Sequence, residues 1–448
     1  MVAMDIGERI KYLNSVGIVD DADSADTTDS AYVLYWMVNA QRCEFNHGIE
    51  YAIYMSNKLS KPLVVFFGAE VEYQYKRHRD FMFEGLRDVA EGLRNRGIRF
   101  VVSDCSGEAG VNKLSSSAVM IITDKPYIRE EVAARDNILE QVSCSFVEVE
   151  SNVLVPVEVV SNKEEYAAST IRRKLWSQIS MGSFDFVEEE VGPNVYYHGY
   201  VMEELDLKNT LKEKEVELIG GSVEAHRKLE DFVENRLVNY ALRSNPSEDW
   251  CSGLSPYLHF GQISPVEIYL RMNDVGSGGI DVSGFLEELI VRRELAFNFV
   301  YFNSNYDKFE CLPNWARVSL GKHREDIREY LYSLDELESA RTYDVYWNSA
   351  QRELVGSGLM HNYMRMYWGK KILEWSPSPE VAFASALYLN NKYSLDGFDP
   401  NSFAGVAWCF GKHDRPWKER SIFGMVRFMN DKGLVRKFKM GPYLEKWM

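Results

Sequence analysis

Residues 360–375 read MHNYMRMYWGKKILEW, and this stretch places an arginine within a run of large apolar side chains. On a helix, steps of four, three, four and three collect one face: His361, Arg365, Trp368, Ile372 and Trp375. Burying a guanidinium in such a face costs several kcal/mol unless an anion or a polar ligand meets it. Either Arg365 extends to solvent beside two core tryptophans, or this face lines a ligand site.

The chain before this helix begins with an α/β pattern. Between residues 31 and 150, helix-like segments alternate with five β-rich runs: YVLYWM, PLVVFFG, IRFVVS, AVMIIT and SFVEVE. This alternation predicts a doubly wound parallel sheet. The first strand is followed by VNAQRCEFN, which lacks the glycines that let a backbone approach a pyrophosphate, so an ordinary dinucleotide site is not expected there.

The remaining chain predicts a second, all-helical domain. We expect an acidic flexible leader at residues 1–30, the α/β domain at 31–150, a connection at 151–221 and a helical bundle at 222–448. Seven of the ten tryptophans lie in the carboxy-terminal part of the bundle: 315, 347, 368, 375, 408, 417 and 447. Such density suits a large core, and it also suits stacking on a planar ligand.

Charge is distributed unevenly along the chain. The formal net charge is −16, but the segment from Asn401 onward contains ten Lys and Arg residues and only four Asp and Glu residues. A basic surface can therefore coexist with an acidic chain, and this surface either contacts DNA or only aids solubility.

The six cysteines are scattered without a CxxC pair, which predicts reduced thiols and no metal site. No signal core or membrane-length apolar run is present in the sequence, so we expect a soluble, intracellular protein.

Three further motifs carry polar groups into apolar surroundings. In SGLSPYLHFGQISP (252–265), Ser255–Pro256 and Ser264–Pro265 read as helix N-cap and first helical residue, or as a cradle for a phosphate. In FLEELIVRRELAFNF (285–299), Glu288 and Arg292 either pair along the helix or the carboxylate points into a cavity. In LYLNNKYSLDGFDPNSFAGVAW (387–408), the polar residues read as turn formers or as site residues: Asn390, Asp396, Asp399 and Asn401.

Four segments together resemble one family: residues 243–264, 285–295, 360–375 and 395–417. In this order they resemble the flavin domain of class II cyclobutane pyrimidine dimer DNA photolyases, of the photolyase and cryptochrome superfamily. The resemblance covers residues 31–448, and HDRPW and DGFDPN are its class-specific parts. Near the first strand the chain keeps Arg42, Glu44 and Asn46 but has Phe45 where the family has aspartate.

The resemblance implies an α/β antenna domain joined to a helical domain that holds FAD in a folded conformation, active as FADH⁻. It assigns Tyr240 and the loop Ser252, Gly253, Leu254 and Ser255 to the phosphate and ribityl parts. Arg365 and Asp396 would lie against the isoalloxazine, and Asn390 would face its N5. A second chromophore of deazaflavin or folate type would occupy the antenna domain.

The implied reaction is light-driven electron transfer to a pyrimidine dimer flipped out of UV-damaged DNA. Glu288 would bind the dimer, and Met366 and Trp408 would pack against it. The flanking DNA would meet Arg243, Ser244, His413 and Arg415. Trp347, Trp368 and Trp375 would form a photoreduction chain in an unsettled order, with Trp347 as a link towards the surface. We expect a monomer without membrane contact.

Two alternatives remain at the level of sequence. A cryptochrome-type photoreceptor would bind FAD and signal without repair, and it typically lacks a polar dimer pocket. Glu288 therefore favours the enzyme. The other alternative is a helical scaffold without flavin.

Overall fold

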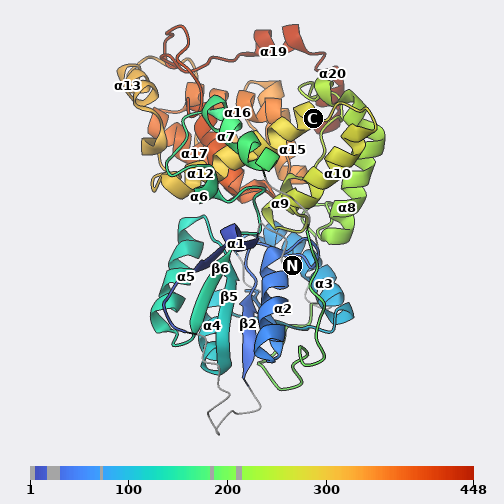
Figure 1. Ribbon diagram of the computed structural model, residues 1–448. Coiled ribbons are helices and arrows are strands. Elements are labelled where there is room, and N and C mark those ends of the chain that lie inside the picture. The colour runs from blue at the N-terminus through green and yellow to red at the C-terminus, as the bar shows by residue number, and fades with distance from the viewer. Residues whose placement is uncertain (1–5, 18–30, 71–73, 182–185, 208–213) are drawn as a thin grey trace.

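The computed structural model describes residues 6–17, 31–70, 74–181, 186–207 and 214–448. Figure 1 shows two lobes, with an α/β lobe formed by the early part of the chain below a helical lobe. Within these residues, no helix is both long and apolar enough to cross a membrane.

The α/β lobe is built on one six-stranded sheet in the order β1-β6-β5-β2-β3-β4. Its strands are β1 (Ile10–Tyr12), β2 (Tyr32–Trp36), β3 (Leu63–Gly68), β4 (Arg99–Ser103), β5 (Ala118–Asp124) and β6 (Ser145–Val149). Strands β2 to β6 are parallel, and β1 joins β6 antiparallel. The five predicted strands and the doubly wound arrangement are confirmed, because apolar runs buried on both faces require helices on both sides.

Helices cover both faces of the sheet. The face towards one core carries α2 (His47–Leu59) and α3 (Lys76–Asn95), and the opposite face carries α4 (Gly107–Leu114) and α5 (Arg129–Gln141). The short helix η1 (Ser115–Ser117) leads into β5. Asn46 fixes the start of α2, because its side chain accepts a hydrogen bond from the backbone of Ile49 at 3.1 Å.

Part of the segment assigned to a leader is ordered into the sheet. Residues Ile6–Arg9 form α1, and Ile10–Tyr12 form β1 at the edge of the sheet. The Arg9 guanidinium donates to the carbonyl oxygens of Glu150 and Val153 at 2.9 and 3.0 Å. A strand of this length is not visible as periodicity, which is why the sequence did not separate it from the acidic run. Residues 1–5 and 18–30 of the predicted leader lie outside the described residues.

The connection and the helical lobe contain the remaining elements. The connection holds α6 (Val157–Val160) and α7 (Ala168–Met181), and α8 begins at Ser222. The helical lobe continues with α8 (Ser222–Asp231), η2 (Phe232–Arg236), η3 (Leu237–Leu242), α9 (Ser255–His259), α10 (Pro265–Ser277), α11 (Ser283–Leu286), η4 (Glu287–Arg292), α12 (Arg293–Phe302), η5 (Phe309–Cys311), α13 (Asn314–Lys322), α14 (Leu334–Glu338), α15 (Val345–Ser357), α16 (Asn362–Trp375), α17 (Pro379–Tyr393), α18 (Pro400–Cys409), α19 (Asp431–Lys437) and α20 (Gly441–Trp447).

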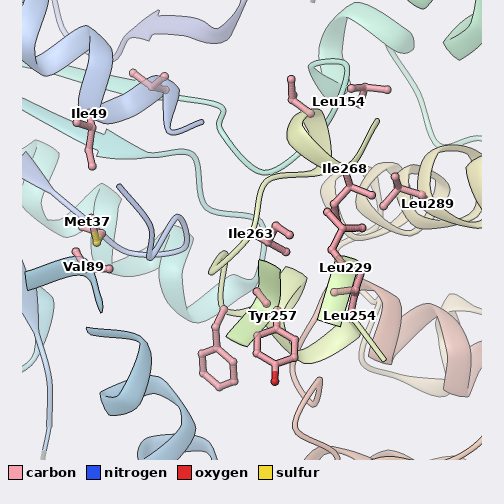
Figure 2. Close-up of a cluster of buried hydrophobic side chains, with 14 of the residues drawn as sticks. Met37, Ile49, Val89, Leu154, Leu229, Leu254, Tyr257, Ile263, Ile268 and Leu289 are labelled. Atoms are coloured by element: carbon pink, nitrogen blue, oxygen red, sulfur yellow. The ribbon is translucent and has the colours of Figure 1, made fainter. Parts of the chain in front are cut away.

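One hydrophobic core runs across the boundary between the lobes. Figure 2 shows part of it, where Met37 and Val89 of the α/β lobe belong to the same cluster as Tyr257 and Leu289 of the helical lobe. Polar ties reinforce it. The buried Arg42 guanidinium donates to the carbonyl oxygen of Gly261 at 2.9 Å, across the boundary. The two lobes therefore hold a fixed relation around any site between or beside them.

Candidate functional site

The helix that carries Arg365 buries its tryptophans in the core, and its Arg365 side chain contacts Ser394 and Asp396. Trp368, Ile372 and Trp375 are buried, whereas the Arg365 side chain is 16% exposed. Its Nη2 lies 3.4 Å from Ser394 Oγ and 3.5 Å from Asp396 Oδ1. These long distances are weak hydrogen bonds, so the guanidinium keeps capacity for a further polar partner. Arg365 therefore neither reaches free solvent nor lies in a purely apolar face.

Asp396 is the anionic partner, placed two residues after Ser394 beyond the end of α17. The Ser394 hydroxyl donates to its carboxylate. Burial alone would raise the pKa of Asp396, but the Arg365 guanidinium and the hydroxyls of Ser394 and Ser255 outweigh it, so the pKa lies below its usual value. The pair therefore presents fixed opposite charges at one place.

The loop before α9 lies against this pair. Ser264 is the N-cap of α10, as predicted, since its side chain accepts from Val266 N at 3.2 Å. The predicted N-cap role of Ser255 is wrong: α9 begins at Ser255, and Leu254 before it supplies no side-chain cap. The exposed Ser255 instead uses its hydroxyl on Asp396. This role of Ser255 depends on Asp396, which lies 141 residues later in the sequence. The local sequence around Ser255 therefore cannot reveal it.

Gly253 gives the same loop an open backbone. Its φ of +69° is a conformation that side chains rarely adopt, and a Cβ built there would meet nothing within 4 Å. The backbone at Gly253 is therefore free to meet a ligand closely.

One histidine and one arginine that the sequence analysis did not single out belong to this neighbourhood. His259 Nδ1 lies 3.4 Å from Asp399 Oδ2. The buried Arg293 guanidinium stacks over Phe297 at 4.5 Å and lies within electrostatic reach of Asp399. Among the described residues, neither Nη1 nor Nη2 of Arg293 has a hydrogen-bond partner. The signal was available, because VRREL puts a second arginine into an otherwise apolar helix.

Glu288 pairs with Arg243 rather than along its own helix. Its Oε1 lies 3.0 Å from Arg243 Nη2, and the two side chains are 38% and 32% exposed. Residues Glu287–Arg292 form a π-helical turn, and Arg292 pairs with Glu287 at 3.2 Å. Of the two interpretations of Glu288, pairing with Arg292 does not hold, because the wider turn makes Glu287 the partner of Arg292.

Arg243 is fixed from two sides. Its guanidinium lies over the Tyr240 ring at 4.5 Å, and that ring packs on Phe232 and Phe285. His361, the N-cap of α16, donates from Nε2 to the Arg243 carbonyl at 2.8 Å. The partly exposed Arg243–Glu288 pair is thus anchored to the helix that carries Arg365.

The amides and acids of residues 387–408 are divided between the two interpretations. Asp399 is a turn former, since it caps α18 by accepting from Asn401 N at 2.7 Å. Asn390 is buried in α17, and its amide donates to Ser402 Oγ at 2.7 Å. The Ser402 hydroxyl donates in turn to Asn391 at 2.6 Å, so the orientation of Asn390 is fixed by a short polar chain.

The predicted DNA-facing residues are not all at the surface. Ser244 and Arg415 are exposed, whereas Met366 and Trp408 are half-buried. His413 is half-buried: its Nδ1 donates to the Tyr166 carbonyl at 2.9 Å, and its Nε2 is buried. Burial lowers the pKa of His413 to about 4. Its place beside the flanking DNA stays a prediction.

The three tryptophans form a contiguous buried row with Trp347 in the middle. The rings of Trp347 and Trp368 lie 6.3 Å apart and nearly parallel, and those of Trp347 and Trp375 lie 5.6 Å apart. Trp347 is fully buried between the other two rings, and its place as a link towards the surface stays a prediction. The partly exposed rings beyond Trp375 are Tyr332 and Tyr343, at 5.3 and 5.7 Å.

The sequence of the chain is similar to those of known proteins. The chain is 43% identical to a deoxyribodipyrimidine photo-lyase of Methanothermobacter thermautotrophicus, over 98% of each chain. The chain belongs to the DNA photolyase family. The model of that family, DNA photolyase, matches residues 33–181, which hold the parallel strands and the first part of the connection. The enzyme expected from the four motifs, a deoxyribodipyrimidine photo-lyase, is confirmed at the level of the family.

Solved structures of photolyases and cryptochromes share the fold. An archaeal photolyase of Sulfolobus tokodaii, described with two FAD molecules, aligns with a TM-score of 0.72 at 18% identity over 93% of this chain and 90% of that one. A cryptochrome of Synechocystis sp. PCC6803 aligns with a TM-score of 0.73 at 14% identity over 93% and 88%. The fold is therefore common to photolyases and cryptochromes. Within the photolyase family, the assignment to class II stays a prediction.

Proposed function

We propose that this photolyase repairs cyclobutane pyrimidine dimers in UV-damaged DNA by light-driven electron transfer from reduced FAD, as a member of class II. The observation that carries the proposal is the Arg365–Asp396 pair beside the open Ser252–Ser255 loop, with the Glu288–Arg243 pair tied to the same helix through His361. The Arg365–Asp396 pair suits a cofactor, and the Glu288–Arg243 pair suits a substrate.

The residues fit an anionic, planar cofactor. Arg293 is buried with both terminal nitrogens unpaired within the described residues, which is costly unless an anionic group meets them. The diphosphate of FAD is such a group. Gly253 leaves the backbone of the Ser252–Ser255 loop open, and Arg365 retains donor capacity for the ring system. When bound, reduced FAD supplies a light-absorbing donor of one electron.

The protein's own residues would then bind, orient and exclude water. Arg365 and Asp396 would hold the ring system, and Asn390, whose amide donates to Ser402, would face its N5. Tyr240 and the Ser252–Ser255 loop would hold the ribityl and phosphate parts. Glu288 accepts a hydrogen bond from the base edge of a flipped dimer, for which Arg243 would have to give way or share the carboxylate.

The same geometry suggests how electrons enter. Trp368 lies three residues from Arg365 on α16, and the ring contacts order the row as Trp368, Trp347, Trp375. We infer that electrons move inwards along this row to the cofactor. A second chromophore of deazaflavin or folate type in the α/β lobe remains a further prediction, and the two FAD molecules of the Sulfolobus tokodaii protein make FAD a third candidate.

The test is a repair assay on an oligonucleotide with one thymine dimer, with chemically reduced protein, under blue light and in the dark. The proposal expects loss of dimers in the light only. Flavin bound without repair would favour the cryptochrome-type photoreceptor, and a purified protein without flavin absorbance would favour the helical scaffold.

A further inference from the structure

Asp344 is a buried carboxylate that joins the tryptophan row to a tyrosine. It is the N-cap of α15, where its Oδ1 accepts from the backbone of Tyr346 at 3.0 Å and of Trp347 at 3.1 Å. Its Oδ2 accepts from the hydroxyl of Tyr367. The carboxylate is 4% exposed, so these contacts are shielded from water. One side chain therefore touches both the middle tryptophan's backbone and a phenol.

Tyr367 lies next to the row along α16. It is fully buried and directly precedes Trp368 on α16. Trp347, whose ring stacks on Trp368, also donates from Nε1 to the Trp368 carbonyl at 3.0 Å. Burial and the Asp344 carboxylate raise the pKa of Tyr367, so the resting phenol keeps its proton at neutral pH.

Lys371 connects the outer end of the row to Tyr367 and Asp344. Its Nζ lies 5.1 Å from the centroid of the Trp375 ring and 5.9 Å from that of the Tyr367 ring. Its carboxylate partners are Glu374 at 2.8 Å and Asp344 at 3.9 Å. The Tyr367 phenol therefore lies close to Trp375 as well as to Asp344.

We propose that Tyr367 and Asp344 form a proton-coupled trap for the oxidising equivalent left on the tryptophans after photoreduction, which rests on the electron path of the proposed function. The Tyr367 phenol gives one electron to the tryptophan radical cation, which returns to neutral tryptophan. The phenolic O–H bond breaks at the same time, and its proton goes to Asp344. The products are a neutral tyrosyl radical and a protonated carboxyl group, so charge and electrons balance.

Such a trap would slow charge recombination. A neutral radical exerts no Coulomb attraction on the transferred electron, and its return requires the proton to move back from Asp344. Charge recombination is therefore slowed, which leaves time for an external reductant to act. A purely structural clamp between α15 and α16 would fix the helices equally well but would hold no radical.

The experiment is flash photolysis of the protein with its flavin oxidised, in H2O and in D2O. The variants are Tyr367→Phe, which removes the phenol, and Asp344→Asn, which keeps a good N-cap but removes the base. Tyr343→Phe, at an exposed tyrosine near Trp375, is the matched control. Wild type and Tyr343→Phe should show a tyrosyl radical whose formation is slower in D2O. Both test variants should keep only the tryptophan radical, with recombination about tenfold faster.

A second arm separates this inference from the electron path itself. Azide radicals generated by pulse radiolysis oxidise tryptophan in the flavin-bound protein in the dark. A tyrosyl signal that is present in wild type and absent in Tyr367→Phe would support the trap even if light produced no radical pair, in which case the proposed path fails alone. A tyrosyl signal that survives in Tyr367→Phe, or recombination unchanged in both test variants, would overturn the trap.

Discussion

At the scale of single residues, Arg365 and Asp396 place two charges inside a lobe otherwise packed with aromatic rings. Each is about one-sixth exposed or less, and the distance between them is 3.5 Å. Such a pair contributes little to folding, because desolvation offsets much of the Coulomb attraction. Its retention is better explained by a ligand that uses both charges.

We expect Asp396→Asn to bind flavin at least about tenfold more weakly, because a charge-assisted hydrogen bond typically contributes about 1.5–3 kcal/mol. The measurement is flavin retained per protein after gel filtration, followed by titration with FAD. Asp335→Asn, at an exposed acid on α14, is the control and should bind like wild type. Equal affinity in Asp396→Asn would remove Asp396 from the cofactor site.

Single residues were predictable where their type conflicted with the local pattern. Arg365 and Glu288 stood out because a charge interrupts an apolar helix face. Arg293 also places a charge on this helix, but the sequence did not distinguish it from its neighbour Arg292. The role of Ser255 could not be predicted, because its partner Asp396 is brought to it only by the fold.

At the scale of elements, α15 and α16 cross so that one tryptophan from α15 fits between two from α16. The three indoles are fully buried, and Trp368 Nε1 donates to Gln351 Oε1 at 2.8 Å. The spacing of 368 and 375 on one helix was readable from the sequence. The position of Trp347 between them was not, since it depends on how the two helices pack.

Trp347→Phe should break the row at its middle. The variant keeps most of the volume but loses the indole hydrogen bond to Trp368, so we expect a loss of about 1 kcal/mol in stability. It should bind flavin, fail to photoreduce it, and repair dimers once reduced chemically, as should Trp368→Phe. Trp417→Phe, at a ring 40% exposed, is the control. Normal photoreduction in Trp347→Phe, followed by absorbance under blue light, would place the path elsewhere.

The π-helical turn at Glu287–Arg292 shows where element-level prediction stops. Apolar periodicity indicated one continuous helix through residues 285–299, and the chain is helical there. In this wider turn, Glu287 pairs with Arg172 at 2.7 Å and Glu288 pairs with Arg243 at 3.0 Å. It directs Glu288 to a residue of another element, and no local pattern encodes that choice.

At the scale of the whole molecule, the two lobes are joined by a shared core and by buried polar ties. His78 on α3 donates to the Ser394 carbonyl at 2.6 Å, two residues before Asp396. The order of the predicted strands and helices was enough to indicate both lobes. The extent of the core that joins them was not, because residues as distant as Met37 and Leu289 contribute to it.

We expect acid pH to lower the stability of the folded protein through His78, which lies at the boundary between the lobes. Burial lowers the pKa of His78 to about 4 in the folded protein, against about 6.5 in an unfolded chain. Above pH 6.5 both states are neutral at this residue. Below it, only the unfolded chain takes up the proton, so folding loses about 1.4 kcal/mol per pH unit down to pH 4.

The measurement is the free energy of urea unfolding of wild type and His78→Gln at pH 6.5 and pH 5. Glutamine retains an amide donor for Ser394 but does not titrate. The advantage of wild type over the variant should shrink by about 2 kcal/mol between these pH values. A difference that stays constant with pH would show that His78 does not carry the acid sensitivity.

The basic carboxy-terminal part should make DNA binding depend on salt despite the net charge of −16. We expect the affinity for dimer-containing duplex to fall linearly on a logarithmic plot against salt concentration, with a slope of about −0.9 per phosphate contact. Arg415→Ala should reduce the slope by about one. Arg94→Ala, at an exposed arginine on α3, is the control. A flat titration for wild type would contradict an electrostatic interface.

The central claim is that one lobe brings a flavin held by Arg365 and Asp396 to a dimer held by Glu288. The most direct measurement is the number of dimers repaired per absorbed photon by wild type and Glu288→Gln, both chemically reduced and matched for flavin content. Glutamine keeps the volume of Glu288 but removes its charge and its pairing with Arg243. The account predicts equal flavin content and a clearly lower yield in Glu288→Gln, with no repair by either protein in the dark. An unchanged yield in the variant would contradict it.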